Sequence, residues 1–101
     1  MPIHHTVIIT FTRNLTAEES SELLDAAFAM KARIPAILDI KCGLDLGLSG
    51  SAGIMFSLIA TFADIHAYEE YRTHPVHVKF IEDHIKPVLA DRKAVQFETR
   101  M

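Results

Sequence analysis

This chain of 101 residues has few of the features that would tie it to an oxidising compartment, a nucleic acid or a membrane. Its single cysteine, Cys42, excludes an intrachain disulfide and a thiolate metal site. The Lys and Arg residues are scattered in a chain of net charge −3, with Arg92 and Lys93 the one adjacent pair, so no basic cluster exists to neutralise phosphates. No apolar run reaches the roughly 18 residues that span a bilayer, and residues 1–5 do not open a secretion signal. We therefore expect a cytoplasmic protein that binds neither nucleic acid nor membrane.

Apolar residues, in contrast, are abundant. They make up 50% of the chain, and the mean hydropathy is +0.20. The length fits a single domain, residues 1–101, which would bury roughly 60–65% of its unfolded surface. Some apolar surface should then remain outside the core, and we expect it to form a subunit interface or a dry ligand cavity.

The first half of the chain shows the patterns of a strand, a helix and a second strand. Residues 5–11 alternate as a strand with one strongly apolar face. A capping box at Thr16 opens a helix over residues 17–32, which Pro35 closes. Residues 37–46 form the next strand, with a bulge or close backbone approach at Gly43. The small residues 47–53 then predict a hairpin connection.

The second half predicts the remaining elements of an α+β domain. Residues 54–62 are nearly all apolar, which is typical of a central strand covered on both faces. Because helices of so short a chain cover only one face, we expect a second copy to cover the other. Asp64 caps a helix that ends before Pro75, a third helix starts near Val76, and residues 94–99 form an edge strand. This order is close to the ferredoxin-like arrangement.

The segment 71–77, Tyr-Arg-Thr-His-Pro-Val-His, contains the candidate catalytic residues. Pro75 must break a helix and disfavours helical backbone at His74. Tyr71 should then end one helix while His77 begins the next, so that a phenol and an imidazole meet across a corner. Such a pair in a cleft suits proton transfer, although it also suits ordinary packing.

The chain resembles the stress-responsive dimeric α/β-barrel (Dabb) family over nearly its whole length. The specific match is Tyr-x-x-His-Pro-x-His at residues 71–77; shorter matches are His-Thr-Val-Ile-Ile-Thr-Phe at 5–11, Ile-Pro at 34–35, Cys-Gly at 42–43 and Ala-Thr-Phe at 60–62. The resemblance implies a ferredoxin-like α/β sandwich whose antiparallel sheet packs against that of a second copy, giving a dimeric α+β barrel. The family includes a plant polyketide cyclase that uses a tyrosine and a histidine, which match Tyr71 and His77, and has a further pocket histidine that matches His5. Ala27 stands where the cyclase has a large aromatic residue, and the segment between His77 and Phe97 is longer here, so the cyclase's acyl-chain specificity is not carried over.

These residues define an expected site. His77 would be the general base, and Tyr71 would donate a hydrogen bond to a developing enolate oxygen. The other expected pocket residues are His5, Val7, Ile9, Leu23, Ala27, Leu58 and Ala60. Alternatively, His77 satisfies backbone groups at the helix start and Tyr71 simply finds a partner. His5 would orient His77 or contact the ligand, or serve as a hydrogen-bonded core residue, the interpretation we favour.

Three functions remain open. The leading one is a homodimeric, cofactor-independent proton-transfer catalyst, such as a cyclase or isomerase, that binds a small hydrophobic metabolite bearing a carbonyl group. The second is a non-catalytic stress-responsive binding or structural protein. The third is a cofactor-free quinol-type monooxygenase. We expect no cofactor and no metal, since His74, His77 and His84 lack cysteine partners or a His-Glu-x-x-His pattern; His74 is expected to be a cap or interface residue.

Overall fold

A four-stranded sheet and a layer of helices make up the domain. The computed structural model describes residues 1–50 and 54–100. In chain order the elements are β1 (Ile3–Phe11), α1 (Ala17–Arg33), β2 (Asp39–Leu44), β3 (Met55–Phe62), α2 (Ile65–Thr73), α3 (Pro75–Phe80), the π-helical turn η1 (Ile81–Ile85), the 3₁₀ turn η2 (Lys86–Val88) and β4 (Leu89–Glu98).

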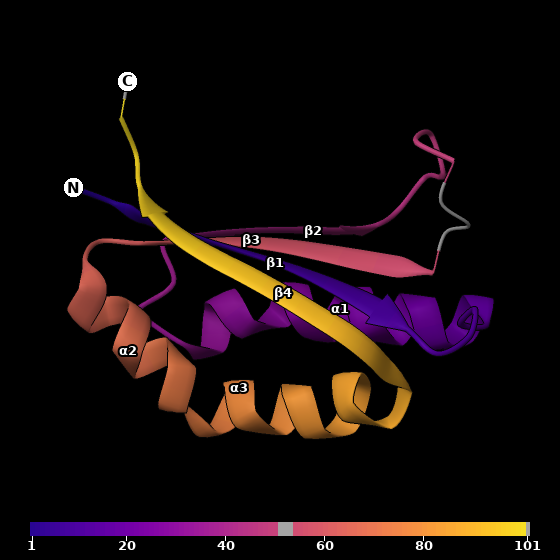
Figure 1. Ribbon diagram of the computed structural model, residues 1–101. Helices are drawn as coiled ribbons and strands as arrows, with labels where there is room; N and C mark the ends of the chain where they lie inside the picture. Colours follow the sequence, from indigo (N-terminus) through magenta and orange to yellow (C-terminus); the bar gives the residue numbers. More distant parts are fainter. Residues whose placement is uncertain (51–53, 101) are drawn as a thin grey trace.

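The sheet has the order β2-β3-β1-β4, with every neighbouring pair antiparallel. All helices lie on one face of it, as Figure 1 shows. This is the ferredoxin-like fold that the sequence predicted. Across the sheet, His5 of β1 pairs with Ala60 of β3 and with Gln96 of β4. Because paired residues point to the same face, these three side chains all face the helices.

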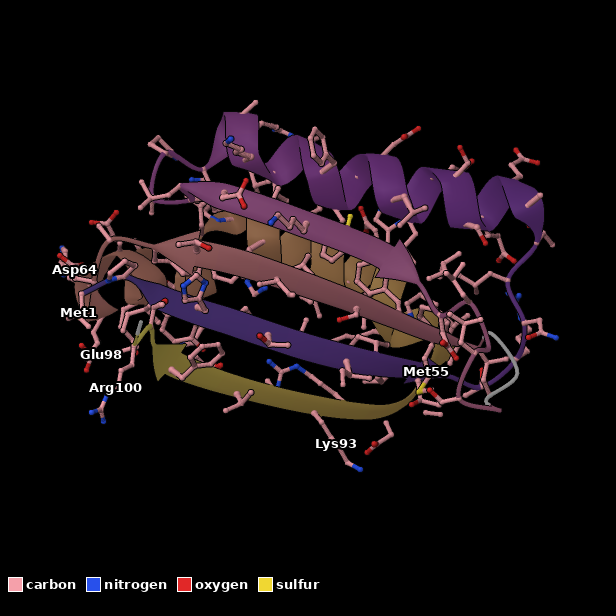
Figure 2. All side chains as sticks on the ribbon, turned by 90° about the horizontal axis from the view of Figure 1, so that it is seen from above. Met1, Met55, Asp64, Lys93, Glu98 and Arg100 are labelled. Atoms are coloured by element: carbon pink, nitrogen blue, oxygen red, sulfur yellow. The ribbon has the colours of Figure 1, made fainter. Side chains whose placement is uncertain are left out.

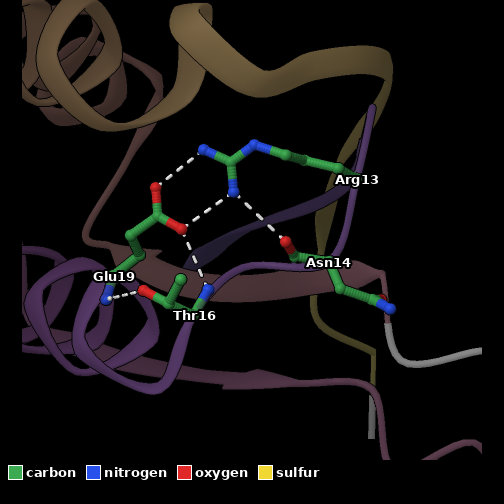
Figure 3. Close-up of polar contacts among 4 residues, drawn as sticks. All are labelled: Arg13, Asn14, Thr16 and Glu19. Atoms are coloured by element: carbon green, nitrogen blue, oxygen red, sulfur yellow. Dashed lines mark hydrogen bonds and ion pairs between the residues drawn. The ribbon is translucent and has the colours of Figure 1, made fainter.

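The capping box at the start of α1 is confirmed (Figure 3). The Thr16 hydroxyl accepts a hydrogen bond from the Glu19 amide at 3.1 Å, and the Glu19 carboxylate accepts one from the Thr16 amide at 2.9 Å. Both terminal nitrogens of Arg13 also donate to this carboxylate at 2.8 Å. The Arg13 guanidinium and the Thr16 amide lower the pKa of Glu19 to about 2, so the cap stays ionised at any ordinary pH.

Several predicted details need correction. The bulge at Gly43 is wrong: the β2–β3 ladder runs without a shift, and a Cβ at Gly43 would meet nothing within 4 Å. The register shift lies instead in the β1–β4 ladder, between Thr10 and Phe11. The last strand begins at Leu89 rather than at residue 94, because the charged residues 91–93 conceal its alternation. Part of the predicted hairpin connection, residues 51–53, lies outside the described residues.

The core lies between the sheet and the helices, while the other sheet face is uncovered (Figure 2). That uncovered face carries exposed apolar side chains, namely Ile8, Ile59, Val95 and Phe97. In the described part of the chain, no helix is both long and apolar enough to cross a membrane.

Candidate functional site

The site begins at the corner between α2 and α3. His74 has extended backbone (φ −64°, ψ 135°), and its Nδ1 accepts a hydrogen bond from the Val76 amide at 3.1 Å. His74 therefore caps α3, as predicted, and Pro75 occupies the first helical position, where its missing N–H costs nothing. The turn brings the rings of Tyr71 and His77 together, with centroids 4.2 Å apart and planes inclined by 38°.

These two rings line a small cavity between the sheet and the α3–η1 segment. Its volume is about 20 Å³, room for roughly one water-sized group. The lining residues are His5, Val7, Ile9, Phe56, Leu58, Tyr71, His77, Phe80, Ile81, Ile85 and Arg92. All of them are buried except Arg92, which is exposed, and His77 and Ile81, which are half-buried. The mouth of the cavity therefore lies between β4 and the α3–η1 segment.

His77 is held as a neutral base. Its Nδ1 lies 3.1 Å from the backbone oxygen of Arg72. A carbonyl oxygen only accepts hydrogen bonds, so Nδ1 carries the proton and Nε2 keeps its lone pair. Burial lowers the pKa of His77 and outweighs the hydrogen bond to Arg72, which raises it. At pH 7 the ring is uncharged and has one free basic nitrogen.

The hydroxyl of Tyr71 is kept protonated. The side chain is only 3% exposed, and burial raises its pKa above the usual value. Within residues 1–50 and 54–100, this hydroxyl forms no hydrogen bond to the protein. Among the described residues, Thr99 Oγ1 and not the Tyr71 hydroxyl is the fully buried side-chain polar atom without a partner, so this hydroxyl keeps some access to solvent. It can therefore donate to a water or a ligand oxygen.

His5 has a different partner. Its Nδ1 lies 2.7 Å from Oε1 of Gln96, which also accepts a hydrogen bond from the Tyr68 hydroxyl at 3.4 Å. The His5 ring is 3% exposed and contacts the Tyr71 ring at a centroid distance of 5.7 Å. Burial lowers the pKa of His5, so it too is neutral at pH 7. Its hydrogen bond goes to Gln96 rather than to His77, which makes it a bonded core residue at the cavity wall.

The structure brings together only part of the expected pocket. His5, Val7, Ile9 and Leu58 line the cavity with Tyr71 and His77. The other expected residues, Leu23, Ala27 and Ala60, are buried but do not line it. The reason is that α1, which carries Leu23 and Ala27, packs over the β2 side of the sheet, away from the cavity.

Sequence reasoning missed five lining residues: Phe56, Phe80, Ile81, Ile85 and Arg92. Phe80, Ile81 and Ile85 follow the apolar spacing of a helix, and strand alternation places Phe56 on the same face as Leu58, so both patterns could have found these residues. Arg92 had no such signal, because the start of β4 was not recognised. Among the described residues, no three His, Cys, Asp or Glu side chains lie close enough together to hold a metal ion.

Comparison with known proteins assigns the family. The stress responsive A/B barrel domain (Dabb) matches residues 3–99, so the chain belongs to this family. A dimeric ferredoxin-like protein of unknown function from Thermobifida fusca YX is 31% identical and superposes with a TM-score of 0.83, covering 98% of this chain and 92% of that one. A search of functionally curated proteins found no significant match.

Two enzymes share the fold at lower identity. The hydroxynitrile lyase from Passiflora edulis is 15% identical, with a TM-score of 0.79 over 95% of this chain and 91% of that one. SnoaB, a cofactor-independent oxygenase from Streptomyces nogalater, is 13% identical, with a TM-score of 0.77 over 99% of this chain and 94% of that one. At these identities the likeness shows the fold alone.

Proposed function

We propose that this protein is a cofactor-independent proton-transfer catalyst that acts on a small carbonyl compound. One observation carries the proposal: the hydrogen bond from His77 Nδ1 to the Arg72 carbonyl oxygen leaves Nε2 basic, on a ring whose centroid lies 4.2 Å from that of Tyr71. A neutral base and a protonated donor in one buried cavity are the two groups that enolisation requires.

The reaction would run as follows. His77 Nε2 takes a proton from the carbon next to the carbonyl group, and the C–H electron pair forms the carbon–carbon double bond of an enolate. Tyr71 donates a hydrogen bond to the enolate oxygen. Return of the proton gives exchange or isomerisation, whereas attack of the enolate carbon on a second carbonyl group gives cyclisation. The low pKa of His77 favours the neutral form that starts this cycle.

The cavity sets a limit on what enters. A volume of about 20 Å³ accepts a carbonyl oxygen but not a polyketide or an aromatic ring. The remainder of a ligand would have to lie at the mouth, between β4 and Ile81. A larger substrate requires the α3–η1 segment to move, and this segment includes a π-helical turn, a feature found frequently at functional sites.

The same small volume favours a second candidate, a non-catalytic structural protein. His77 and His5 each form a hydrogen bond within the fold, and both sit among packed side chains. On this account the two histidines stabilise the helix corner and the β1–β4 pairing. Replacing His77 would then lower thermal stability without changing the binding of any ligand.

We further propose that the protein is a homodimer. The sheet face away from the helices carries Ile8, Ile59, Val95 and Phe97, each between 40% and 55% exposed. They come from three adjacent strands, and a hollow of about 430 Å³ lies over Ile8, Ile59 and Met55 on this face. So much exposed apolar surface on one face is typical of a subunit interface. The 31% identical relative from Thermobifida fusca is described as dimeric.

Proton exchange into D₂O tests the catalytic proposal. Levulinate (4-oxopentanoate) and its methyl ester carry ketone-adjacent protons whose loss is followed by proton NMR. We expect the wild-type protein at pH 7.5 to exchange at least one of them faster than buffer does, and His77→Ala to lose about 10²–10⁴-fold. The control, His66→Ala, removes an exposed imidazole on α2 and should leave exchange unchanged.

The outcomes separate the candidates. Exchange at the buffer rate by both wild type and His77→Ala would contradict catalysis on these probes and support the structural candidate if His77→Ala also melts earlier. Oxygen uptake measured in the same samples would reveal oxygenase chemistry.

A further inference from the structure

Among the residues that the structure describes, Arg92 is the one charged residue that lines the cavity. It lies on β4 opposite Ile9, in the same ladder that places Gln96 opposite His5. Since side chains alternate along a strand, Arg92 and Gln96 both face the helix side of the sheet. Arg92 therefore stands at the mouth of the cavity, on the wall across from the α3–η1 segment.

Within residues 1–50 and 54–100, no carboxylate pairs with this guanidinium. In the described parts of the chain, Arg92 forms no hydrogen bond and no ion pair. The neighbouring Asp91 points to the opposite face, where it lies 3.9 Å from Lys93 Nζ. Glu98 shares the face of Arg92 but is six residues away, about 20 Å along the strand.

The charge of Arg92 instead acts on the site. Burial is the main cause of the low pKa values of His5 and His77, and the positive charge of Arg92 lowers both further. The same charge counteracts the rise that burial causes in the pKa of Tyr71. Arg92 thus disfavours cations at the cavity and favours anions.

We propose that Arg92 determines specificity by binding a substrate carboxylate, so that the substrate is a small oxo acid with an enolisable carbonyl group. The planar guanidinium matches a carboxylate with two parallel hydrogen bonds. The cavity takes the carbonyl oxygen, and the carboxylate stays at the mouth, where Arg92 is solvent-exposed. The carbonyl half of this inference rests on the proposed function; the carboxylate half rests on Arg92.

Arg92 has a second possible role, which is to keep the edge strand β4 from pairing with other chains. Charged side chains on an edge strand hinder pairing with other chains, and β4 is an edge strand. That role needs only a charge and predicts no preference for a ligand. If Arg92 binds a carboxylate, substituting it weakens the binding of a carboxylate probe. If Arg92 only protects the edge strand, the substitution leaves that binding unchanged.

Binding is measured with levulinate and methyl levulinate, which differ by the charge of the carboxylate, in NMR titrations at about 50 mM salt. We expect wild type to bind levulinate more tightly than the ester, and Arg92→Gln to weaken levulinate binding by about 10- to 100-fold without affecting the ester. Arg92→Lys should retain an intermediate affinity. The matched control is Lys93→Gln, which removes one positive charge from the opposite face of β4 and should bind as wild type does. Thermal unfolding verifies that each variant is folded.

Equal affinity of wild type and Arg92→Gln for levulinate would overturn the inference, as would failure of wild type to bind levulinate at millimolar concentration. Preferential binding that requires Arg92, found without proton exchange, would support the inference while contradicting the proposed catalysis. Exchange that occurs equally with both probes in wild type and Arg92→Gln would support the proposed catalysis and contradict the inference about Arg92.

Discussion

Replacing Tyr71 by phenylalanine separates a functional hydroxyl from a structural one. The side chain is 3% exposed, and its ring contacts His77, His5 and Phe62. Tyr71→Phe keeps these ring contacts and removes only an O–H that bonds to no described protein group. If the hydroxyl is retained for a ligand, the substitution should spare the fold and impair the chemistry.

The expected magnitudes follow from that geometry. A buried hydroxyl with a protein partner contributes about 1 kcal/mol, but the Tyr71 hydroxyl has no such partner in the described residues and is not fully buried. We therefore expect Tyr71→Phe to change the free energy of unfolding by less than about 0.5 kcal/mol in either direction. Loss of the proposed enolate donor should lower the exchange rate by about 10²–10³-fold.

Urea unfolding and proton exchange are measured on the same preparations, at one protein concentration because dimerisation affects stability. Tyr68→Phe is the matched control, since its hydroxyl donates to Gln96. That variant should lose a few tenths of a kcal/mol and keep its exchange activity. Destabilisation of Tyr71→Phe by more than about 1 kcal/mol, with exchange unaltered, would refute the reasoning.

Three further predictions concern pH, capping and assembly. Burial lowers the pKa of His77 in the folded state, so the contribution of His77 to stability is complete above pH 6.5 and is lost as pH falls toward the lower folded pKa. In urea unfolding, the free energy of unfolding should therefore fall less between pH 7.5 and pH 5.5 for His77→Gln than for wild type. Thr16→Ala removes the α1 cap and should cost about 1 kcal/mol in the same assay, whereas Thr12→Ala, before the cap, should cost less. Ile8→Asp places a charge on the uncovered sheet face and should shift sedimentation at micromolar concentration from dimer to monomer; a wild-type monomer would contradict the dimer.

Elements with a strong local signal were predictable from the sequence. The capping box at Thr16 and the cap at Asp64 fix the starts of α1 and α2, alternation identifies β1, and a nearly continuous apolar run identifies β3. The corner at Pro75 was also predictable, because proline restricts its own backbone and that of His74. These signals depend only on residues close together in the chain.

The rest depends on tertiary packing, which local patterns do not contain. The π-helical turn η1 has the apolar spacing of an ordinary helix, so that spacing did not predict a π-helical turn. The cavity is lined by Phe80 and Ile85 from the helical layer and by residues of β1 and β3 from the sheet, and its volume depends on how these side chains pack. Arg92 joins the site only because β4 pairs with β1 over nearly its full length, a register that the charged residues 91–93 conceal.

The most direct test of the account is the protonation state of His77, read from nitrogen-15 NMR of the imidazole rings at pH 7. We predict the neutral ring with the proton on Nδ1 and an unprotonated Nε2 whose resonance shifts when levulinate is added, while that of exposed His66 does not. A ring that is charged at pH 7, or that carries its proton on Nε2, would contradict the claim that His77 is a free base in the cavity.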